Sequence, residues 1–457
     1  MEYKKSIFNV DIEKLPDGRK LIYNTYSGIF GIMDIKTQGI FNNIENFGSL
    51  DVDENEENNV SIMLKSGYIV DKETDELAAL KLERTRARHP QDALNLTIAP
   101  TLDCNMRCPY CYENRSNLAM TEETQEQLVA FLKSQIQVNP LIKNVHVMWY
   151  GGEPLLHKNI IYSLSEKFIR YCTEREIKYT AAIITNGVLL DVKTAKRLAD
   201  ECKVSSTQIT IDGMKETHNK RRLLMSGEGS WDAIIQNIDN SKSFLPISIR
   251  VNIDKDNICD VDSLTKHFIE EKGWTKNPQF YLAPVEDFSD SCLSGKSSCL
   301  EGGEFAEVNI ECLRALYEAN RESVASQFFP RRRPVFCAGE GLSNYIVDPE
   351  GFYSNCYVTI GSKEKRTGHI SKPFLITREY GKWLLSDIPE ECEQCEYLPM
   401  CMGGCGIYRI VNDNSPKCFK TYYTYKDVLK LAYEDYIKQK MSPKNELSKE
   451  ERAAASL

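Results

Sequence analysis

Three closely spaced cysteines are the residues in this chain best suited to chemistry. Cys104, Cys108 and Cys111 follow the pattern C-x3-C-x2-C. Three thiolates at this spacing can each bind one iron of a cubane cluster, which leaves the fourth iron without a protein ligand. A small molecule with an amine and a carboxylate can chelate that iron. A zinc site is the alternative, but zinc usually has a closed set of four ligands and this spacing is unusual for it.

Seven further cysteines form a second spaced group toward the C-terminus. They are Cys337, Cys356, Cys392, Cys395, Cys401, Cys405 and Cys418. Seven thiols exceed the ligand set of one zinc ion, so a single zinc ribbon does not account for them. The remaining six of the 16 cysteines have no regular spacing, and most are expected to be small apolar side chains.

The composition is that of an ordinary globular protein. The 457 residues are 42% hydrophobic and 27% charged, and the net charge is −9. This acidic balance argues against general nucleic-acid binding, which needs a basic face. No apolar run is long enough to span a membrane, and the N-terminus lacks a signal-peptide core, so we expect a cytoplasmic protein without membrane contact.

Six short β-rich runs alternate with segments long enough for a helix, which predicts a parallel sheet with helices outside, either doubly wound or curled into a barrel. The runs are Leu94–Ala99, Val145–Trp149, Thr180–Ile184, Gln208–Ile211, Ile247–Ile253 and Gln279–Ala283. The cysteine motif follows the first run. Other polar motifs also stand at run ends, where sheets of this class place their sites.

This arrangement resembles the radical S-adenosylmethionine (radical SAM) superfamily. The resemblance implies a partial (β/α)6 barrel and one 4Fe–4S cluster on Cys104, Cys108 and Cys111, with SAM on the open iron. Gly151-Gly152-Glu153-Pro154 resembles the motif that meets the SAM amino group. Asn186 stands where the family contacts the SAM ribose.

The resemblance further implies a set of cofactor-binding residues at the strand ends. Arg222 corresponds to an arginine near the SAM carboxylate, although Arg221 leaves this assignment uncertain by one position. The full set is Tyr110, Gly151, Gly152, Glu153, Asn186, Asp212, Arg222 and Asn252.

The seven C-terminal cysteines resemble the SPASM extension, whose pattern they match at every position. That resemblance implies two auxiliary 4Fe–4S clusters, giving three clusters in all. The second auxiliary cluster would use Cys392, Cys395, Cys401 and Cys418, and the first would use Cys337, Cys356 and Cys405. No cysteine follows Cys337 before Cys356, so the first auxiliary cluster is expected to keep an open iron unless Cys312 fills it.

The N-terminal segment is predicted to be a small α+β unit. The runs Tyr3–Val10 and Leu21–Met33 suggest a hairpin, followed by a helix at Ile35–Ile44, an acidic loop at Asp51–Asn59 and a helix within Asp71–Arg88. This organisation resembles the winged-helix-like leader-binding element of ribosomal-peptide maturases, which captures a peptide on a sheet edge. An accessory domain for dimerisation or folding is the alternative.

Four segments are expected in all. Residues 1–88 form the peptide-recognition domain, 89–310 the radical SAM barrel, and 311–425 the cysteine-rich SPASM domain with few long periodic elements. Residues 426–457 form the end of an amphipathic helix, Tyr422–Lys440, and a flexible tail.

The combined resemblance implies a peptide maturase. A 5′-deoxyadenosyl radical would take hydrogen from a peptide carbon, and a thioether would form with a cysteine of the precursor's core. A leader on the precursor and a reductant such as flavodoxin or ferredoxin are the implied partners. Alternatives are a carbon–carbon cross-link, anaerobic sulfatase maturation, or a non-catalytic iron–sulfur sensor or carrier. Sulfatase-maturating relatives have an aspartate where this chain has Tyr357, which disfavours that alternative.

Overall fold

The computed structural model describes residues 2–44, 54–113, 115–286, 298–320 and 329–441. Two compact units divide the chain. The smaller unit contains residues 1–87, 324–337 and 387–457, and the larger contains 88–323 and 338–386. The segment predicted for 311–425 is therefore divided between the two units. In the part of the chain described, no helix is long and apolar enough to cross a membrane.

The smaller unit is built on a three-stranded antiparallel sheet in the order β2-β3-β4. Its elements are β1 (Tyr3–Lys5), β2 (Asn9–Lys14), β3 (Lys20–Asn24), β4 (Ile29–Met33), α1 (Ile35–Asn43), α2 (Glu54–Ser66), β5 (Ile69–Asp71), α3 (Glu76–Arg88, whose last residue belongs to the larger unit), α13 (Leu398–Cys401), α14 (Gly406–Val411) and α15 (Lys420–Met441). The short strands β1 and β5 pair with each other.

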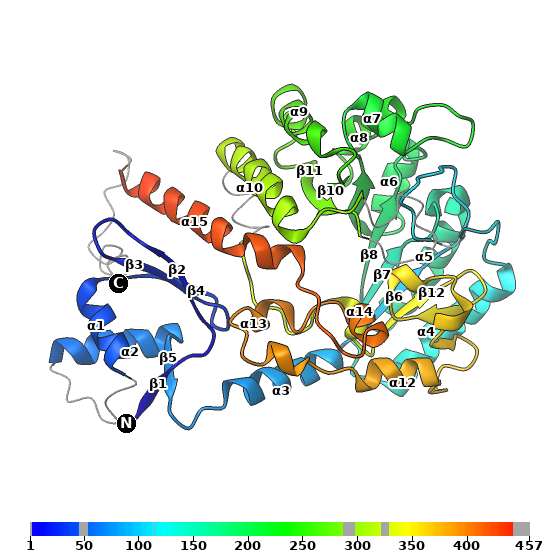
Figure 1. Cartoon of the computed structure of the whole chain (residues 1–457). Coiled ribbons are helices and arrows are strands. Elements are labelled where there is room, and N and C mark those ends of the chain that lie inside the picture. The colour runs from blue at the N-terminus through cyan, green and yellow to red at the C-terminus, as the bar shows by residue number, and fades with distance from the viewer. Residues whose placement is uncertain (1, 45–53, 114, 287–297, 321–328, 442–457) are drawn as a thin grey trace. The chain divides into compact units, whose positions relative to one another are not determined.

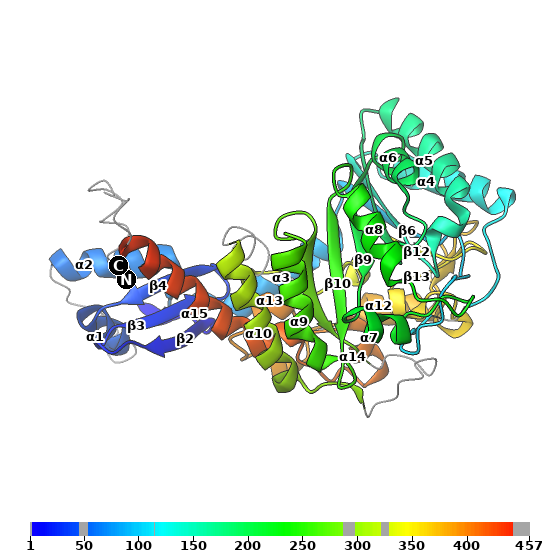
Figure 2. The same ribbon diagram turned by 90° about the horizontal axis from the view of Figure 1, so that it is seen from above.

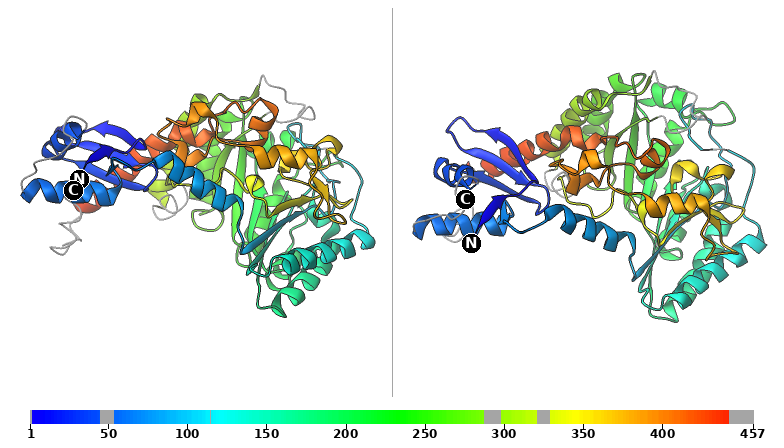
Figure 3. Two further views of the ribbon diagram at one scale, coloured as in Figure 1. Left: turned by 90° about the horizontal axis from the view of Figure 1, so that it is seen from below. Right: turned by 60° about the horizontal axis from the view of Figure 1, so that its bottom comes forward.

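Alternation along β3 explains how this sheet is covered on both faces. Leu21 and Tyr23 pack with α13 and α15, whereas Ile22 packs with α1 and α2. Figure 3 shows α15, in red, beside the blue sheet. The C-terminal helix and the N-terminal strands, far apart in sequence, thus share one core.

The predicted hairpin is present, but the runs around it are more broken than expected. Strands β2 and β3 pair across the turn at Pro16–Arg19, and Gly18 has the positive φ of 86° that such a turn needs. The run Leu21–Met33 splits into β3 and β4 because the Asn24 side chain accepts hydrogen bonds from the Tyr26 and Ser27 amides. Likewise, Tyr3–Val10 contains β1 and the start of β2.

Two further local predictions need correction. The acidic segment Asp51–Asn59 was expected to be a loop, but helix α2 begins at Glu54, and 51–53 lie outside the described residues. Acidic residues in a first helical turn are favourable there, so the charge pattern was compatible with a helix. Residues 311–425 were expected to contain few long periodic elements, but α10 (Gly302–Ala319), which is 18 residues long and begins with a capping box at Glu301, extends into them. The predicted flexible tail, 442–457, lies outside the described residues.

The larger unit contains a nine-stranded sheet in the order β11-β10-β9-β8-β7-β6-β12-β13-β14. Its strands are β6 (Ala93–Ile98), β7 (Asn144–Trp149), β8 (Lys178–Thr185), β9 (Val204–Thr210), β10 (Ile247–Ile253), β11 (Gln279–Pro284), β12 (Asn344–Val347), β13 (Phe352–Ser354) and β14 (Gly368–His369). Strands β6 to β11 are parallel and lie in chain order, with β12 parallel to β6 on the other side. The six predicted strands are confirmed.

Helices connect these strands as crossovers. They are α4 (Glu122–Val138), α5 (Lys158–Thr173), α6 (Val192–Asp200), α7 (Lys215–Arg221), α8 (Trp231–Ser241) and α9 (Val261–Lys266), with the 3₁₀ turn η1 (Pro154–His157) before α5; a further helix, α12 (Arg378–Leu385), follows β14. Crossovers between sequential parallel strands are right-handed, so the helices gather on one face of the sheet. Figures 1 and 2 show α4, α5 and α6 together on that side. All carboxyl ends of the parallel strands therefore meet at one edge.

Candidate functional site

The cysteine motif lies in the loop after β6, at the carboxyl edge of the parallel strands. Cys104, Cys108 and Cys111 all line one cavity of about 450 Å³, a volume suited to a small ligand. Burial raises the pKa of the Cys104 thiol to about 12, and the nearby Glu153 carboxylate adds to this shift. Burial also raises the pKa of Cys111. Binding a metal would remove the protons that burial holds on these thiols.

The two glycines after β7 let the chain pass directly against the cysteine loop. Gly151 has a φ of 110°, and a Cβ on it would overlap the Thr101 carbonyl oxygen. A Cβ on Gly152 would overlap the Asp103 carbonyl group. The amides of Gly152 and Glu153 instead donate hydrogen bonds of 3.2 and 2.8 Å to those two carbonyl oxygens. Both glycines line the cavity, so this side of it is shaped by backbone.

Glu153 is the centre of a buried hydrogen-bond network at the end of β7. Its carboxylate is fully buried and accepts hydrogen bonds from the Thr185 hydroxyl at 2.7 Å, the Asn186 amide at 2.7 Å and the Leu155 amide at 3.0 Å. It is not among the residues that line the cavity. In this structure Glu153 joins the end of β7 to the end of β8 and caps η1.

Asn186 lines the cavity and connects the end of β8 to the cysteine loop. Its Nδ2 donates a hydrogen bond of 2.7 Å to Asn105 Oδ1, and the same nitrogen lies 4.0 Å from Cys104 Sγ. Its Oδ1 accepts from the Val188 amide. The turn that follows uses a positive φ at Gly187. The predicted ribose-contacting residue is therefore held beside the first cysteine.

Tyr110, Asp212 and Arg222 form a buried polar triad beside the cysteines. The Tyr110 hydroxyl donates to Asp212 Oδ2 and accepts a hydrogen bond of 2.6 Å from Arg222 Nη1. Asp212 also accepts from the Asn252 amide, and its charge lies 3.7 Å from Arg222. Asp212 was predicted to bind cofactor, but it is fully buried and does not line the cavity, so it orients the other residues. Tyr110, Arg222 and Asn252 do line it.

The structure separates the roles of the two adjacent arginines. Arg221 forms a bidentate pair with the buried carboxylate of Asp254, at 2.9 and 2.8 Å. Its charge is therefore already matched. Arg222 lines the cavity and Arg221 does not, whereas the buried Nε of both arginines has no hydrogen-bond partner within the described part of the chain. An unsatisfied buried donor is costly unless a ligand completes it, which suits the carboxylate of a bound small molecule.

His218 packs against the buried triad through hydrogen bonds of its imidazole ring. Its Nδ1 accepts a hydrogen bond from the Asp212 amide, and its Nε2 contacts the Ser230 hydroxyl at 3.0 Å. Burial, followed by the charges of Arg222 and Arg221, lowers the pKa of His218 well below its ordinary value. A neutral, fully buried imidazole is a structural residue here, and it does not line the cavity.

An aromatic wall, which the motifs did not reveal, lies across the cavity. Tyr112 and Tyr150 share a hydrogen bond between their hydroxyls, and the ring of Tyr357 packs edge-on against Tyr150 at 5.1 Å between centroids. Thr97 donates a hydrogen bond of 3.3 Å to the Tyr357 hydroxyl. Burial raises the pKa of the neighbouring Glu113 carboxyl to about 7. Only Tyr357 had drawn attention in the sequence, by comparison with an expected aspartate.

Four of the C-terminal cysteines come together in the smaller unit. Burial and the proximity of Cys395 and Cys418 raise the pKa of Cys392 to about 11. Burial and the other three thiols raise that of Cys401 to about 12. These effects place the thiols of Cys392, Cys395, Cys401 and Cys418 in one region of the smaller unit, but no group of three or more His, Cys, Asp or Glu side chains among the described residues is arranged to hold a metal ion.

The other predicted auxiliary set falls in both units. Cys337 and Cys405 belong to the smaller unit and Cys356 to the larger, so this set remains a prediction. Cys312 is placed more clearly. It is buried on α10, and its sulfur accepts a hydrogen bond from the Thr265 hydroxyl at 3.6 Å. Burial raises its pKa to about 12, as expected of an inert core thiol.

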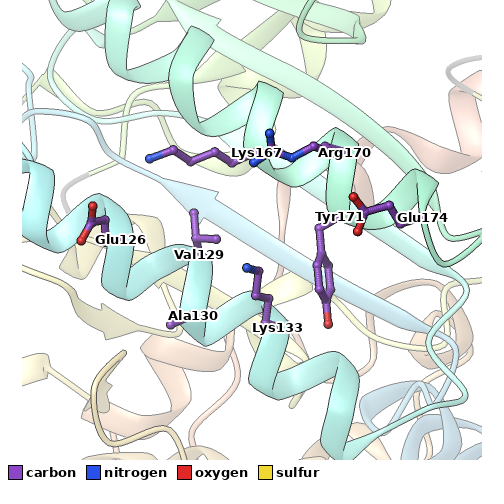
Figure 4. A pocket seen from close by; sticks show the side chains of 8 residues that line it. All are labelled: Glu126, Val129, Ala130, Lys133, Lys167, Arg170, Tyr171 and Glu174. Carbon is purple, nitrogen blue, oxygen red and sulfur yellow. The ribbon is translucent and has the colours of Figure 1, made fainter.

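A second hollow, of about 500 Å³, lies on the outer surface between α4 and α5. Figure 4 shows its lining, which mixes acidic and basic side chains around Tyr171. The Lys133 ammonium lies 5.4 Å from the Tyr171 ring centroid, an arrangement that stabilises a surface cation. None of the predicted site residues lines this hollow.

The chain is similar to known proteins in sequence and in fold. Residues 98–268 match the family described as the Radical SAM superfamily. The chain is 24% identical over 385 residues to a cysteine-type anaerobic sulfatase-maturating enzyme of Clostridium novyi, covering 75% of this chain and 97% of that protein.

Two solved structures show the same fold. A native anSMEcpe structure with bound AdoMet and Cp18Cys peptide has a TM-score of 0.59 and 21% identity, covering 76% of this chain and 98% of that one. Streptococcus suis SuiB bound to precursor peptide SuiA has a TM-score of 0.52 and 16% identity, covering 92% of this chain and 98% of that one.

Proposed function

Because residues 98–268 form a radical SAM domain, we propose that the chain is a peptide maturase that installs thioether cross-links in a ribosomally made precursor. One observation carries the choice of a precursor peptide. The fold match to SuiB, which was solved with its precursor peptide, extends over 92% of this chain, compared with 76% for anSMEcpe. The match to SuiB therefore extends over more of this chain, at a TM-score of 0.52 compared with 0.59 for anSMEcpe.

The residues of the cavity fit the proposed cofactors. Three cysteines and a backbone-walled surface at Gly151 and Gly152 suit a cluster with a small ligand beside it. The unsatisfied Nε of Arg222 suits the SAM carboxylate. When bound, the cluster and SAM supply a 5′-deoxyadenosyl radical that removes a hydrogen atom from the substrate.

The protein's own residues hold these groups and limit access to them. Through its hydroxyl, Tyr110 joins Arg222 to Asp212, so the cysteine loop holds the residue proposed to bind the SAM carboxylate. Asn186 couples the end of β8 to the same loop. The aromatic wall of Tyr112, Tyr150 and Tyr357 adds apolar surface to the cavity lining, which a peptide side chain could contact.

The four thiols of Cys392, Cys395, Cys401 and Cys418 support one auxiliary cluster, and Cys337, Cys356 and Cys405 are proposed to hold another with an open iron. The burial of Cys312 beside Thr265 supports the open iron, since that thiol is engaged elsewhere. An open iron could take the thiolate of a substrate cysteine.

The smaller unit, with its sheet edge at β4, is proposed to bind the precursor's leader. A flavodoxin or ferredoxin would supply electrons in the cytoplasm.

Sulfatase maturation is the second candidate, because the match to the Clostridium novyi enzyme covers 97% of that protein. Tyr357 argues for the thioether reading, since its hydroxyl is engaged with Thr97 and it offers no carboxylate base. Incubating holoenzyme, SAM and dithionite with the precursor encoded beside the gene distinguishes the two. Loss of two hydrogens per link, blocked by prior thiol alkylation, supports the proposal. An aldehyde formed from a sulfatase-derived peptide, with the precursor unchanged, would favour the second candidate.

A further inference from the structure

The cavity contains a second arginine that no part of the cofactor site explains. Arg250 lies on β10, in register with Thr210 on β9 and Tyr281 on β11. Together with Arg222 it supplies the positive charge of the cavity lining. It is half-buried, so its charge acts in a site partly shielded from water.

Arg250 is oriented by the protein but not neutralised by it. Its Nε donates a hydrogen bond of 2.7 Å to Asn252 Oδ1, which fixes the plane of the guanidinium. No carboxylate of the described residues lies within ion-pair distance of it. Arg221 differs in this respect, because both of its terminal nitrogens donate hydrogen bonds to the Asp254 carboxylate.

The free terminal nitrogens of Arg250 present the geometry that binds a carboxylate bidentately. The SAM carboxylate is already assigned to Arg222. We propose that Arg250 binds a carboxylate of the substrate peptide, so that the residue to be modified lies next to an acidic side chain or at the C-terminus. This inference rests on the proposed function and names the class of peptide that it acts on.

A carboxylate held at Arg250 would set the register of the peptide across the cavity. The tyrosines of the aromatic wall offer apolar contact, and Gln208, whose amide oxygen accepts from the Tyr281 hydroxyl at 2.7 Å, also lines the cavity. Charge and shape together would fix which carbon faces the radical. Arg250 is therefore a specificity-determining residue.

The test uses holoenzyme and the precursor encoded beside the gene. Each acidic residue of its core is changed in turn to the corresponding amide, and its C-terminus is either free or amidated. Binding of labelled peptide and kcat/KM for product are measured for wild type, Arg250→Lys, Arg250→Gln and Arg197→Gln. Arg197 is a matched control because it lies on α6, in a surface pair with Glu201.

One carboxylate of the peptide is expected to dominate. Its removal and Arg250→Gln should each lower kcat/KM by roughly 30-fold or more, because each leaves a partly buried charge unpaired. Combining the two changes should add little, and Arg250→Lys should retain part of the activity. Arg197→Gln should behave as wild type.

Three results would overturn the inference. Equal processing of every amide variant and of the amidated peptide would do so, as would fully additive losses in the double change. A rise in the KM for SAM that accounts for the loss in Arg250→Gln would assign Arg250 to the cofactor instead. Absence of product from the unaltered precursor would defeat the proposed function itself, so the two failures are distinguishable.

Discussion

Arg222 donates a hydrogen bond of 2.6 Å from Nη1 to the hydroxyl of Tyr110, a residue inside the cysteine motif. This contact joins the loop after β6 to the region after β9, which are separated by more than a hundred residues of chain. It means that the residue proposed to hold the SAM carboxylate is positioned by the same loop that carries Cys108 and Cys111.

Removing the Tyr110 hydroxyl should therefore weaken SAM binding without removing the cluster. Hydrogen bonds to charged groups contribute roughly 1.5–3 kcal/mol, so Tyr110→Phe should raise the KM for SAM about 10-fold or more. Iron content should match that of wild type. Tyr171→Phe is the control, since the Tyr171 hydroxyl is buried without a partner among the described residues. An unchanged KM for SAM in Tyr110→Phe would contradict this role.

Because the backbone at Gly151 lies against the cysteine loop, we expect one added methyl group to displace that loop and lower activity. Gly151→Ala must adopt a φ of 110° and overlap the Thr101 carbonyl, and the left-handed conformation alone costs about 1–2 kcal/mol. SAM cleavage to 5′-deoxyadenosine should fall at least about 10-fold. The control is Gly303→Ala, because a Cβ there meets open space. Equal activity of both variants would show that the cysteine loop tolerates displacement.

Cys312→Ala should leave the iron content unchanged. Its thiol lies in the core against Thr265, so its removal should cost stability of about 1 kcal/mol and no cluster. Cys401→Ala is the comparison, because its thiol lies among the other three of its set. We expect Cys401→Ala to lose about 4 iron atoms per chain. The same loss of iron in Cys312→Ala would show that Cys312 is a cluster ligand, and the first auxiliary cluster would then have no open iron.

His218 predicts how the stability of the larger unit depends on pH. Its folded-state pKa is lowered by burial and by Arg222 and Arg221, so below about pH 6.5 the unfolded chain binds a proton that the folded chain does not. Stability from this group is complete above the unfolded pKa and falls as the pH decreases, by at most about 1.4 kcal/mol per pH unit. Thermal midpoints measured from pH 7.5 to 5.5 should decline less steeply in His218→Gln than in wild type. Parallel curves would show that His218 does not titrate on unfolding.

Much of the larger unit could be predicted because its signals are local. Six β-rich runs became β6 to β11, and parallel strands in chain order bring their carboxyl ends to one edge. The motifs at those ends, including Gly151 and Asn186, consequently lie beside Cys104. The glycine pair could also be understood in advance as a site of close backbone approach.

The roles of the buried carboxylates could not be predicted. Glu153 and Asp212 have the chemistry of ligand-binding residues, but their partners, such as Thr185 and Asn252, come from other strands. Only the folded structure shows that these carboxylates accept hydrogen bonds from the ends of neighbouring strands. The aromatic wall could not be predicted either. Tyr112, Tyr150 and Tyr357 meet through tertiary packing, and their positions in the sequence follow no periodic pattern.

The division of the C-terminal region between two units was also beyond local patterns. Residues 387–441 share a core with the N-terminal strands, since Leu21 and Leu429 belong to one hydrophobic cluster. A pairing across four hundred residues leaves no periodic mark in either segment. Cysteine spacing identified the thiols, but not the unit to which each belongs.

The central claim is that this cavity takes a hydrogen atom from a carbon of a cysteine-containing precursor. The most direct measurement uses a precursor deuterated at carbon, with holoenzyme, unlabelled SAM and dithionite, and mass spectrometry of the released 5′-deoxyadenosine. We expect deuterium in 5′-deoxyadenosine, in step with the loss of two hydrogens per thioether from the peptide. Unlabelled 5′-deoxyadenosine released while the peptide mass stays constant would contradict the account.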